Sequence, residues 1–377
     1  MDTNKTLLDG LYSVTEEIIG ADEFINYLTR KEELNHYIGF EISGQVHFGT
    51  GLMSGLVVRE LQKLGIHTSY LLADWHTWIN NKFQGDRAFI KQVAEEYFEP
   101  ALLLGAKIAG ADEKKIKINL GSSLYHNNDM YWQSLVDISK SLTVARIMKS
   151  TAIMGRNDSE TMPFGFMLYP PMQVADIFEL KASIAHAGMD QRKVHVIARE
   201  VAEKLTINPM IDSSQNHMKP IAIHHRLLLG LQKPAIWPIP EGMEKSVIRM
   251  QMKMSKSVPG SAIFIHDSID DITRKIKKAF CPDREIVLNP LLDWTKHIIF
   301  PITGLVVIKR EERWGGNFTA NTFEELETRY ASGDLSAIDL KNSITQILIE
   351  ILTPAREYFS NHDSQILLTK MTEKQSR

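Results

Sequence analysis

The 377-residue sequence has a single cysteine and no long run of apolar residues. Cys281 has no partner for an internal disulfide, and no cysteine cluster is present to bind zinc. The 13 histidines show no metal-ligand spacing, so we predict no protein-bound metal. No stretch approaches the roughly 20 apolar residues of a membrane span, and residues 1–20 resemble neither a signal peptide nor a transit peptide. We therefore expect a cytoplasmic protein with no membrane partner.

The chain also lacks a strong net charge, low-complexity segments and internal repeats. Its formal net charge of −3 gives no overall attraction to nucleic acid, so a local basic surface would have to bind any polyanion. Hydrophobic residues make up 44% and charged residues 24%, a balance typical of globular proteins. The length exceeds the size at which one core stops growing, which predicts a large domain and a smaller one.

Short apolar runs alternate with helical patterns through the first two-thirds of the chain. This alternation predicts an α/β fold, a Rossmann-like parallel sheet with crossover helices. The predicted strands are 37–40, 69–73, 115–119 and 183–187, and the predicted helices are 47–64, 86–104, 169–180 and 191–205. Residues from about 120 to 166 are helical and then polar, with no strand of their own, so we interpret them as a helical insertion.

The pattern changes after residue 230. Three prolines between residues 231 and 244 favour an extended connection. Beyond it the pattern is mostly helical. We therefore divide the chain into an α/β catalytic domain at 1–230, a linker at 231–262 and a mainly α-helical C-terminal domain at 263–377.

The stretch His47-Phe48-Gly49-Thr50 has the features of a phosphate-binding helix start. A strand, a turn and a helix that opens at His47 would place backbone N–H groups and the positive end of the helix dipole beside a triphosphate. Gly49 would let a nucleotide approach the backbone closely, and His47 can donate to a phosphate oxygen. By itself such a short motif is more often an ordinary helix start.

The stretch Lys253-Met254-Ser255-Lys256-Ser257 supplies two lysines and two hydroxyls ahead of Pro259-Gly260. This composition suits a mobile loop that tightens on pyrophosphate as charge builds in a transition state. Alone it could equally be a solvated basic loop. Together and in this order, the two stretches indicate an enzyme that uses ATP to adenylate a carboxylate.

These motifs resemble those of class I aminoacyl-tRNA synthetases, in particular the tyrosyl-tRNA synthetases of archaeal and eukaryotic type. Residues 47–50 are similar to the HIGH signature, and residues 253–257 match the KMSKS signature letter for letter. Four further stretches extend the resemblance over nearly the whole chain: 37–41, 71–74, 169–177 and 188–193. The resemblance implies a tyrosine–tRNA ligase. Such an enzyme activates L-tyrosine with ATP and Mg²⁺, releases pyrophosphate and charges the 3′-terminal adenosine of tRNA(Tyr).

Three polar residues, Tyr169, Gln173 and Asp176, project from one face of a predicted helix. From spacing alone, such a stripe is more typical of the wet side of an amphipathic helix. The resemblance implies that it faces the amino acid. Tyr169, Gln173 and Gln191 would hold the α-ammonium group, and Tyr37 and Asp176 would bond the phenolic hydroxyl. A site of this kind rejects phenylalanine by about 10⁴ to 10⁵-fold.

The resemblance also assigns the nucleotide site. Its catalytic positions fall on His47, Thr50, Lys253, Ser255, Lys256 and Ser257. Its ATP-binding positions fall on Gly39, His47, Gly49, Asp190, Met254 and Lys256. Asp190 also precedes a predicted helix, where it could be an N-cap. Thr50 replaces the second histidine of the HIGH signature, so one phosphate contact is lost or passes to a hydroxyl.

One further pocket position falls on His76, although an isolated histidine is more often structural. For tRNA, the resemblance points to Lys149, in an insertion expected to form a homodimer interface near the acceptor stem, and to Arg192 near the first base pair. Trp314 would stack on the first anticodon base, and Asp339 would bond its Watson–Crick edge. From charge alone, the basic residues would be ordinary solvated side chains.

Two alternatives remain open. A tryptophanyl-tRNA synthetase has a related fold and the same ATP motifs but needs an indole-sized pocket, against which Tyr37 and Asp176 argue. A synthetase-derived RNA-binding protein without catalysis would not need an intact His47 and an intact 253–257 stretch.

Overall fold

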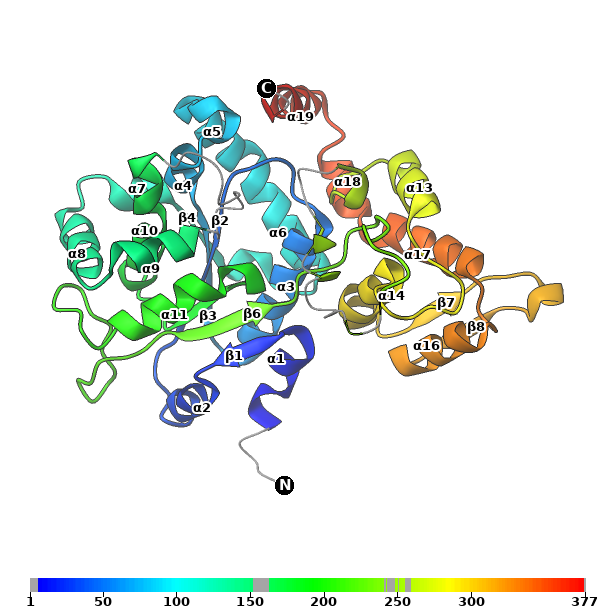
Figure 1. The fold of residues 1–377 in the computed structure, drawn as a ribbon, viewed down its shortest axis with the longest axis horizontal. Coiled ribbons are helices and arrows are strands. Elements are labelled where there is room, and N and C mark those ends of the chain that lie inside the picture. Colours follow the sequence, from blue (N-terminus) through cyan, green and yellow to red (C-terminus); the bar gives the residue numbers. More distant parts are fainter. Residues whose placement is uncertain are drawn as a thin grey trace.

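The chain folds around a six-stranded sheet in the computed structural model, which describes residues 6–151, 163–240, 242, 248–249, 251–254 and 259–375 (Figure 1). The strand order is β1-β6-β5-β2-β3-β4, with β1 antiparallel to β6 and every other pair parallel. The strands of this sheet are β1 (Glu17–Ile19), β2 (Asn35–Phe40), β3 (His67–Leu72), β4 (Ile116–Leu120), β5 (Ile184–Gly188) and β6 (Ile221–His225). The Rossmann-like parallel sheet expected from the sequence is confirmed.

Helices connect the strands and cover both faces of the sheet. The α-helices of this part are α1 (Asp9–Val14), α2 (Ala21–Thr29), α3 (Phe48–Lys63), α4 (Asp74–Ile79), α5 (Arg87–Val93), α6 (Glu99–Ile108), α7 (Gly121–Tyr125), α8 (Asp129–Lys140), α9 (Val144–Ser150), α10 (Tyr169–Glu179) and α11 (Arg192–Val201). Shorter helical turns are η1 (Thr6–Leu8), η2 (Lys82–Gly85), η4 (Glu113–Lys115), η6 (Phe164–Leu168) and η7 (Met189–Gln191), with a π-helical stretch η3 (Ala94–Phe98) between α5 and α6.

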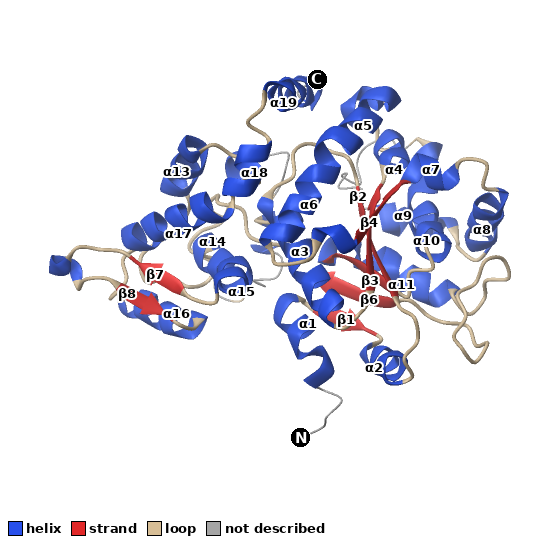
Figure 2. Cartoon of the chain, turned by 180° about the vertical axis from the view of Figure 1, so that it is seen from behind, coloured by secondary structure: helices blue, strands red, loops and turns tan. Residues whose placement is uncertain are grey.

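Two hydrophobic clusters fill the two sides of the sheet. Alternate residues of a strand point to opposite faces. Ile38 of β2 accordingly packs in the cluster that holds α3 and α6, whereas its neighbour Tyr37 belongs to the cluster of α10 and α11. Figure 2 shows α3 and α6 on one side of the sheet and α10 and α11 on the other. Tyr37 therefore faces the same layer as the predicted amino-acid helix.

The C-terminal part is mainly helical, as predicted. It contains α13 (Ile269–Lys278), α14 (Pro290–Trp294), the π-helical stretch η9 (Thr295–Ile299), α15 (Phe300–Thr303), α16 (Phe323–Ser332), α17 (Ala337–Ile351), α18 (Thr353–Tyr358) and α19 (His362–Gln375), with the turns η8 (Pro259–Ser261) and η10 (Glu312–Trp314). A two-stranded antiparallel sheet, β7 (Val306–Ile308) with β8 (Phe318–Ala320), completes it. Among the described helices, none has the length and apolar character needed to cross a membrane.

The predicted strands and most of the predicted helices match observed elements, but four short strands were not predicted. β1, β7 and β8 each have three residues, too few for a periodic pattern. β6 ends in His224-His225, whose polar character hides a strand that is buried along its whole length. The helix predicted to run to residue 205 ends at Val201. The domain boundaries at residues 230 and 262 stay a prediction.

Candidate active site

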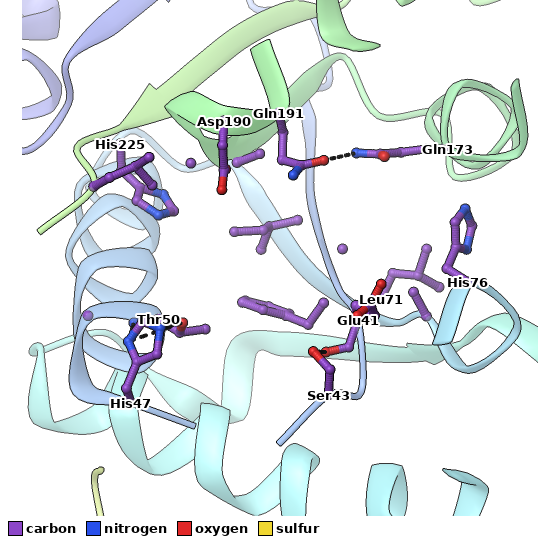
Figure 3. A pocket seen from close by; sticks show the side chains of 18 of the residues that line it. Glu41, Ser43, His47, Thr50, Leu71, His76, Gln173, Asp190, Gln191 and His225 are labelled. Atoms are coloured by element: carbon purple, nitrogen blue, oxygen red, sulfur yellow. Dashed lines mark hydrogen bonds between the residues drawn. The ribbon is translucent and has the colours of Figure 1, made fainter. Parts of the chain in front are cut away.

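A cavity of about 390 Å³ opens at the carboxyl ends of the parallel strands. This edge is where ligands bind in open α/β sheets. Every described residue that the sequence assigned to catalysis, tyrosine or ATP lies on its wall: Tyr37, Gly39, His47, Gly49, Thr50, His76, Tyr169, Gln173, Asp176, Asp190, Gln191, Lys253 and Met254. Ser255, Lys256 and Ser257 lie outside the described residues. Figure 3 shows His47 and Thr50 at one end of the cavity and His76 and Gln173 at the other.

The end near α3 is built on the cap of that helix. His47 is the N-cap of α3, and its Nδ1 accepts the backbone N–H of Thr50 at 3.1 Å. Because Nδ1 is the acceptor of this bond, the ring proton belongs on Nε2, which lies 3.1 Å from the Thr50 hydroxyl oxygen. The Thr50 hydroxyl thus lies beside the ring of His47. The cap bond to Nδ1 makes Nε2 the donor nitrogen of this ring.

Asp190 pairs with the lysine of the second signature. Lys253 Nζ donates to Asp190 Oδ2 at 3.2 Å, and both side chains are half-buried. The alternative N-cap role is wrong, because Asp190 lies inside the turn η7, and Gln191 is the N-cap residue of α11. Asp190, which the sequence assigned to ATP, and Lys253, which it assigned to catalysis, therefore meet at one wall of the cavity although they come from distant segments.

At the other end, Asp176 is fully buried and only half satisfied. Its Oδ1 accepts the hydroxyls of Tyr125 and Tyr131, each at 3.0 Å. Its Oδ2 has no hydrogen-bond partner in the part of the chain that the structure describes, and lies 3.7 Å from His76 Nε2. Burial raises the pKa of Asp176 to about 7, although the bonds from the two tyrosines oppose the shift. Burial likewise lowers the pKa of His76 to about 4, so this ring is neutral.

A second carboxylate, Glu41, stands beside the predicted ammonium-binding residues. Tyr169 donates its hydroxyl to Glu41 Oε2 at 3.2 Å, and Asn80 donates to the same oxygen at 2.7 Å. Gln173 Nε2 donates to Gln191 Oε1 at 3.4 Å across the cavity wall (Figure 3). Glu41 places a carboxylate at the end of the cavity that we expect to bind the α-ammonium group, for which the sequence predicted only neutral side chains. Its position directly after a strand was the available signal.

Other residues that line the cavity or support its wall were also not predicted from the sequence. Tyr125 and Tyr131 come from α7 and α8 of the insertion, and no spacing links them to Asp176. His225 lines the cavity, and its Nδ1 lies 2.8 Å from His186 Nε2. His186 Nδ1 in turn lies 3.1 Å from His36 Nε2. Burial lowers the pKa of all three rings, to about 3 for His36 and about 4 for His225, so a neutral row holds His225 in place.

The residues assigned to tRNA lie away from the cavity wall. The Arg192 guanidinium forms a two-pronged ion pair with Glu17, with distances of 2.7 to 3.0 Å. Lys149 is exposed on α9, and Trp314 is 64% exposed in η10. Asp339 is half-buried in the first turn of α17, where Oδ2 accepts the Ser336 hydroxyl at 2.8 Å. The structure brings the tyrosine and ATP residues together, whereas none of these four is part of the cavity wall.

No group of three or more histidine, cysteine, aspartate or glutamate side chains among the described residues is arranged to hold a metal ion.

Comparison with known proteins finds a matching family model, relatives and solved structures. The family model described as tRNA synthetases class I (W and Y) matches residues 29–353. The tyrosine–tRNA ligase of Pyrococcus abyssi is 47% identical over 371 residues, which cover 98% of each chain. That of Thermococcus sibiricus is 49% identical over 357 residues, 94% of this chain and 95% of the relative. The solved structure of tyrosyl-tRNA synthetase from Pyrococcus horikoshii in complex with L-tyrosine superposes with a TM-score of 0.93 at 46% identity, covering 98% of this chain and 100% of that one.

Proposed function

The chain belongs to the class I tRNA synthetases of the tryptophan and tyrosine family, and we propose that within it the chain is a tyrosine–tRNA ligase. The enzyme activates L-tyrosine with ATP to tyrosyl-adenylate and releases pyrophosphate. It then transfers the tyrosyl group to the 3′-terminal adenosine of tRNA(Tyr). Relatives that share nearly half of their residues over almost the full chain carry this name.

The observation that supports tyrosine as the amino acid is the second oxygen of Asp176. Oδ1 is already bonded to two tyrosine hydroxyls, whereas Oδ2 has no donor among the described residues and lies 3.7 Å from Nε2 of His76, which lines the cavity together with Asp176. A phenol O–H is a donor of the right kind for this oxygen. Phenylalanine would leave this buried oxygen without a donor, and a site of this kind rejects such an analogue by about 10⁴ to 10⁵-fold. An indole ring carries no hydroxyl at the corresponding end.

The other end of the tyrosine fits the charges of the wall. The α-ammonium group would lie among Tyr169, Gln173 and Gln191, with the charge of Glu41 nearby. This placement directs the α-carboxylate toward the nucleotide end of the cavity, where His47 caps α3. The substrate would therefore span the cavity with its reactive group toward ATP.

In the first step, a carboxylate oxygen of tyrosine attacks the α-phosphorus of ATP, and the bond to pyrophosphate breaks. His47 Nε2–H and Lys253 would stabilise the charge that develops on the phosphate oxygens, as would Lys256, which lies outside the described residues. Asp190 would accept from the ribose hydroxyls once Lys253 turns to the phosphates. Gly39, Gly49 and Met254 complete the nucleotide wall. Mg²⁺ would enter bound to the oxygens of the triphosphate.

In the second step, a ribose hydroxyl of the terminal adenosine attacks the adenylate carbonyl carbon, and AMP leaves. No protein nucleophile is required, because positioning and charge stabilisation supply the rate. Lys149 and Arg192 would contact the acceptor stem, while Trp314 and Asp339 would read the anticodon. The exposure of Lys149 and Trp314 is compatible with these roles. An enzyme that charges tRNA works where translation occurs, so we propose a cytoplasmic location.

A homodimer is the proposed assembly. Large apolar side chains that are 40% to 76% exposed gather in the insertion and the segment after it: Met130, Val136, Val144, Met148, Phe164 and Leu168. Scattered exposed apolar residues are normal, but a concentration in one segment is typical of an interaction site. A second copy of the chain would cover this surface.

The amino acid is tested by amino-acid-dependent exchange of labelled pyrophosphate into ATP, with tyrosine, tryptophan and phenylalanine in parallel. We expect exchange with tyrosine and at least 10⁴-fold lower kcat/KM with phenylalanine. Preferential exchange with tryptophan would select the tryptophan enzyme instead. A folded chain with no exchange for any of the three would point to an RNA-binding protein without catalysis.

A further inference from the structure

Asp293 and Trp294, at the end of α14, both bind the backbone of Leu229, which follows Leu228 of the cavity wall. Leu229 donates its backbone N–H to Asp293 Oδ2 at 3.0 Å, and its carbonyl accepts Trp294 Nε1–H at 2.7 Å. All three residues are buried. Neither Asp293 nor Trp294 is part of the described cavity wall. One residue of the chain thus has both backbone polar groups bound by neighbouring side chains of the C-terminal part.

Leu229 is also the partner of Lys253. The two residues form an isolated antiparallel bridge, flanked by Met254 N–H to Leu228 O at 2.8 Å and Gly230 N–H to Met252 O at 2.6 Å. In such a pair, the residues between the bonds turn their own N–H and C=O outward. Residues 228–230 therefore lie between residues 252–254, which we call the lysine segment, and α14.

The indole of Trp294 reaches the first signature as well. Its ring lies 4.5 Å from that of Phe48, centroid to centroid, with an angle of 76° between the planes. Phe48 follows His47, is fully buried, and donates its backbone N–H to Ile263 O at 2.8 Å. One buried side chain therefore contacts the residue next to His47 and the residue paired with Lys253.

Polar and charged side chains around Asp293 link it to the cavity wall. Its Oδ1 pairs with Arg249, and His297 Nε2 lies 3.9 Å from the same oxygen. His297 Nε2 is also 2.8 Å from Arg226 Nη1, and Arg226 lines the cavity. Burial raises the pKa of Asp293, and the neighbouring Arg249 opposes the shift. Burial lowers the pKa of His297 to about 3, so the neutral ring accepts from Arg226.

We propose that Asp293 and Trp294 are positioning residues for adenylation, which fix the lysine segment at its working distance from the helix start at His47. The proposal rests on the function given above and goes beyond it, because neither side chain lines the cavity. Displacement of a catalytic group by about 1 Å can cost on the order of 10²-fold in rate. The two side chains therefore matter for the chemical step more than for the amino-acid site, which is built on Asp176 and α10.

The test uses W294F and D293N in the full-length chain. W294F keeps an aromatic ring against Phe48 but removes the donor to Leu229 O, and D293N keeps an acceptor for Leu229 N–H but removes the charge that faces Arg249. Y330F is the matched control, since Tyr330 donates a buried hydroxyl to Pro282 O at 2.7 Å within the C-terminal part. Each variant is measured by tyrosine-dependent pyrophosphate exchange and by calorimetric titration with tyrosine.

We expect kcat for exchange to fall about 10-fold or more in W294F and D293N, with the tyrosine Kd within twofold of the unchanged chain. Y330F should lower the unfolding midpoint and leave kcat within twofold. The proposal is overturned if kcat is unchanged in both variants, if Y330F loses as much, or if the tyrosine Kd rises in parallel. Absence of exchange in the unchanged chain would instead refute the proposed function.

A second measurement does not depend on activity. Hydrogen exchange of the backbone N–H groups of Gly230 and Met254, which close the bridge, should be at least 10-fold faster in W294F than in the unchanged chain. The same amides in Y330F should exchange as in the unchanged chain. Equal protection in W294F would show that Trp294 does not hold this segment, whatever reaction the enzyme catalyses.

Discussion

Asp176 combines two opposing demands in one side chain. A buried carboxylate disfavours its own ionisation, yet an ionised oxygen is the best acceptor for a phenol. Tyr125 and Tyr131 ease the conflict by donating to Oδ1, while Oδ2 remains for the substrate. The residue that supports tyrosine selection is therefore one that we expect to reduce the stability of the free protein.

This conflict can be measured as a pH dependence of stability. Because the pKa of Asp176 is raised to about 7 in the folded chain, its folded form holds a proton that the unfolded chain has already released between about pH 4 and pH 7. The free energy of unfolding therefore falls as the pH rises through this window, and the full cost is present above it. D176N should be more stable than the unchanged chain at pH 8, by on the order of 1–3 kcal/mol, with a smaller difference at pH 5.

Urea unfolding at the two pH values, without tyrosine, measures the effect. D22N is the control, because Asp22 is an exposed aspartate on α2. A D176N variant that is less stable than the unchanged chain at both pH values would contradict the prediction.

The same substitution should relax specificity. The asparagine amide introduced by D176N can still accept from a hydroxyl but carries no charge, so the penalty for a substrate without a hydroxyl becomes smaller. We expect the ratio of kcat/KM for tyrosine over phenylalanine to fall by about 10-fold or more in D176N. The ratio is measured by pyrophosphate exchange, with D137N, a carboxylate at the surface of α8, as the control. An unchanged ratio would mean that another group recognises the hydroxyl.

At the residue scale, the sequence predicted which side chains meet but not how they are paired. Motif order was enough to bring His47, Asp190 and Lys253 to one cavity. The bond between Asp190 and Lys253, and the support of Asp176 by Tyr125, depend on chain segments that only the tertiary fold brings together. Local patterns carry no information on such contacts, which is why the N-cap alternative for Asp190 failed.

The same limit holds at the scale of elements. Central strands such as β2 and β3 each contain a short apolar run between helices, and the alternation predicted them as strands of a parallel sheet. β6 contributes His225 to the cavity, and β1 pairs antiparallel at the edge, yet neither has a periodic pattern that identifies it. Short edge strands form because a neighbour offers hydrogen bonds, so their own sequence says little.

The lysine segment, which carries Lys253, leads to a prediction about the adenylation step. K253A removes a positive charge from the nucleotide end and leaves the amino-acid end intact, since Lys253 contacts Asp190 and not α10. We expect kcat for pyrophosphate exchange to fall about 10² to 10³-fold, with the tyrosine Kd within twofold. K277A, which removes an exposed lysine of α13, is the control. If tyrosine binding weakens as much as the rate, Lys253 does not act on the phosphates.

At the scale of the whole molecule, the C-terminal helices are continuous with the core. One hydrophobic cluster includes Leu56 of α3 and Leu348 of α17, and Lys374 of α19 pairs with Asp86 next to α5. The chain length predicted a large and a smaller domain, but a core shared by distant segments cannot be read from a linear pattern. This packing includes α14, whose side chains bind Leu229, the residue paired with Lys253 in the lysine segment.

The C-terminal part also carries the predicted anticodon contact. W314A removes an exposed aromatic platform, and stacking on one base is worth about 1–3 kcal/mol. We therefore expect kcat/KM for tRNA charging to fall about 10 to 100-fold, while pyrophosphate exchange stays unchanged. W314F keeps a stacking surface and should retain most of the charging activity. A parallel loss of exchange in W314A would rule out a role confined to tRNA.

The last prediction concerns the assembly. Val144 and Phe164 are 65% and 76% exposed within the apolar segment of the insertion, and a charge on each would have to be buried in a dimer. An unpaired buried charge costs several kcal/mol, so V144D/F164D should convert a dimer to a monomer at micromolar concentration. Sedimentation equilibrium measures the mass. I338D is the matched control, because Ile338 is 70% exposed on α17, outside the segment, and its variant should keep the mass of the unchanged chain. A monomeric unchanged chain, or a dimer that survives V144D/F164D, would contradict the proposed interface, since no apolar surface could then be hidden there.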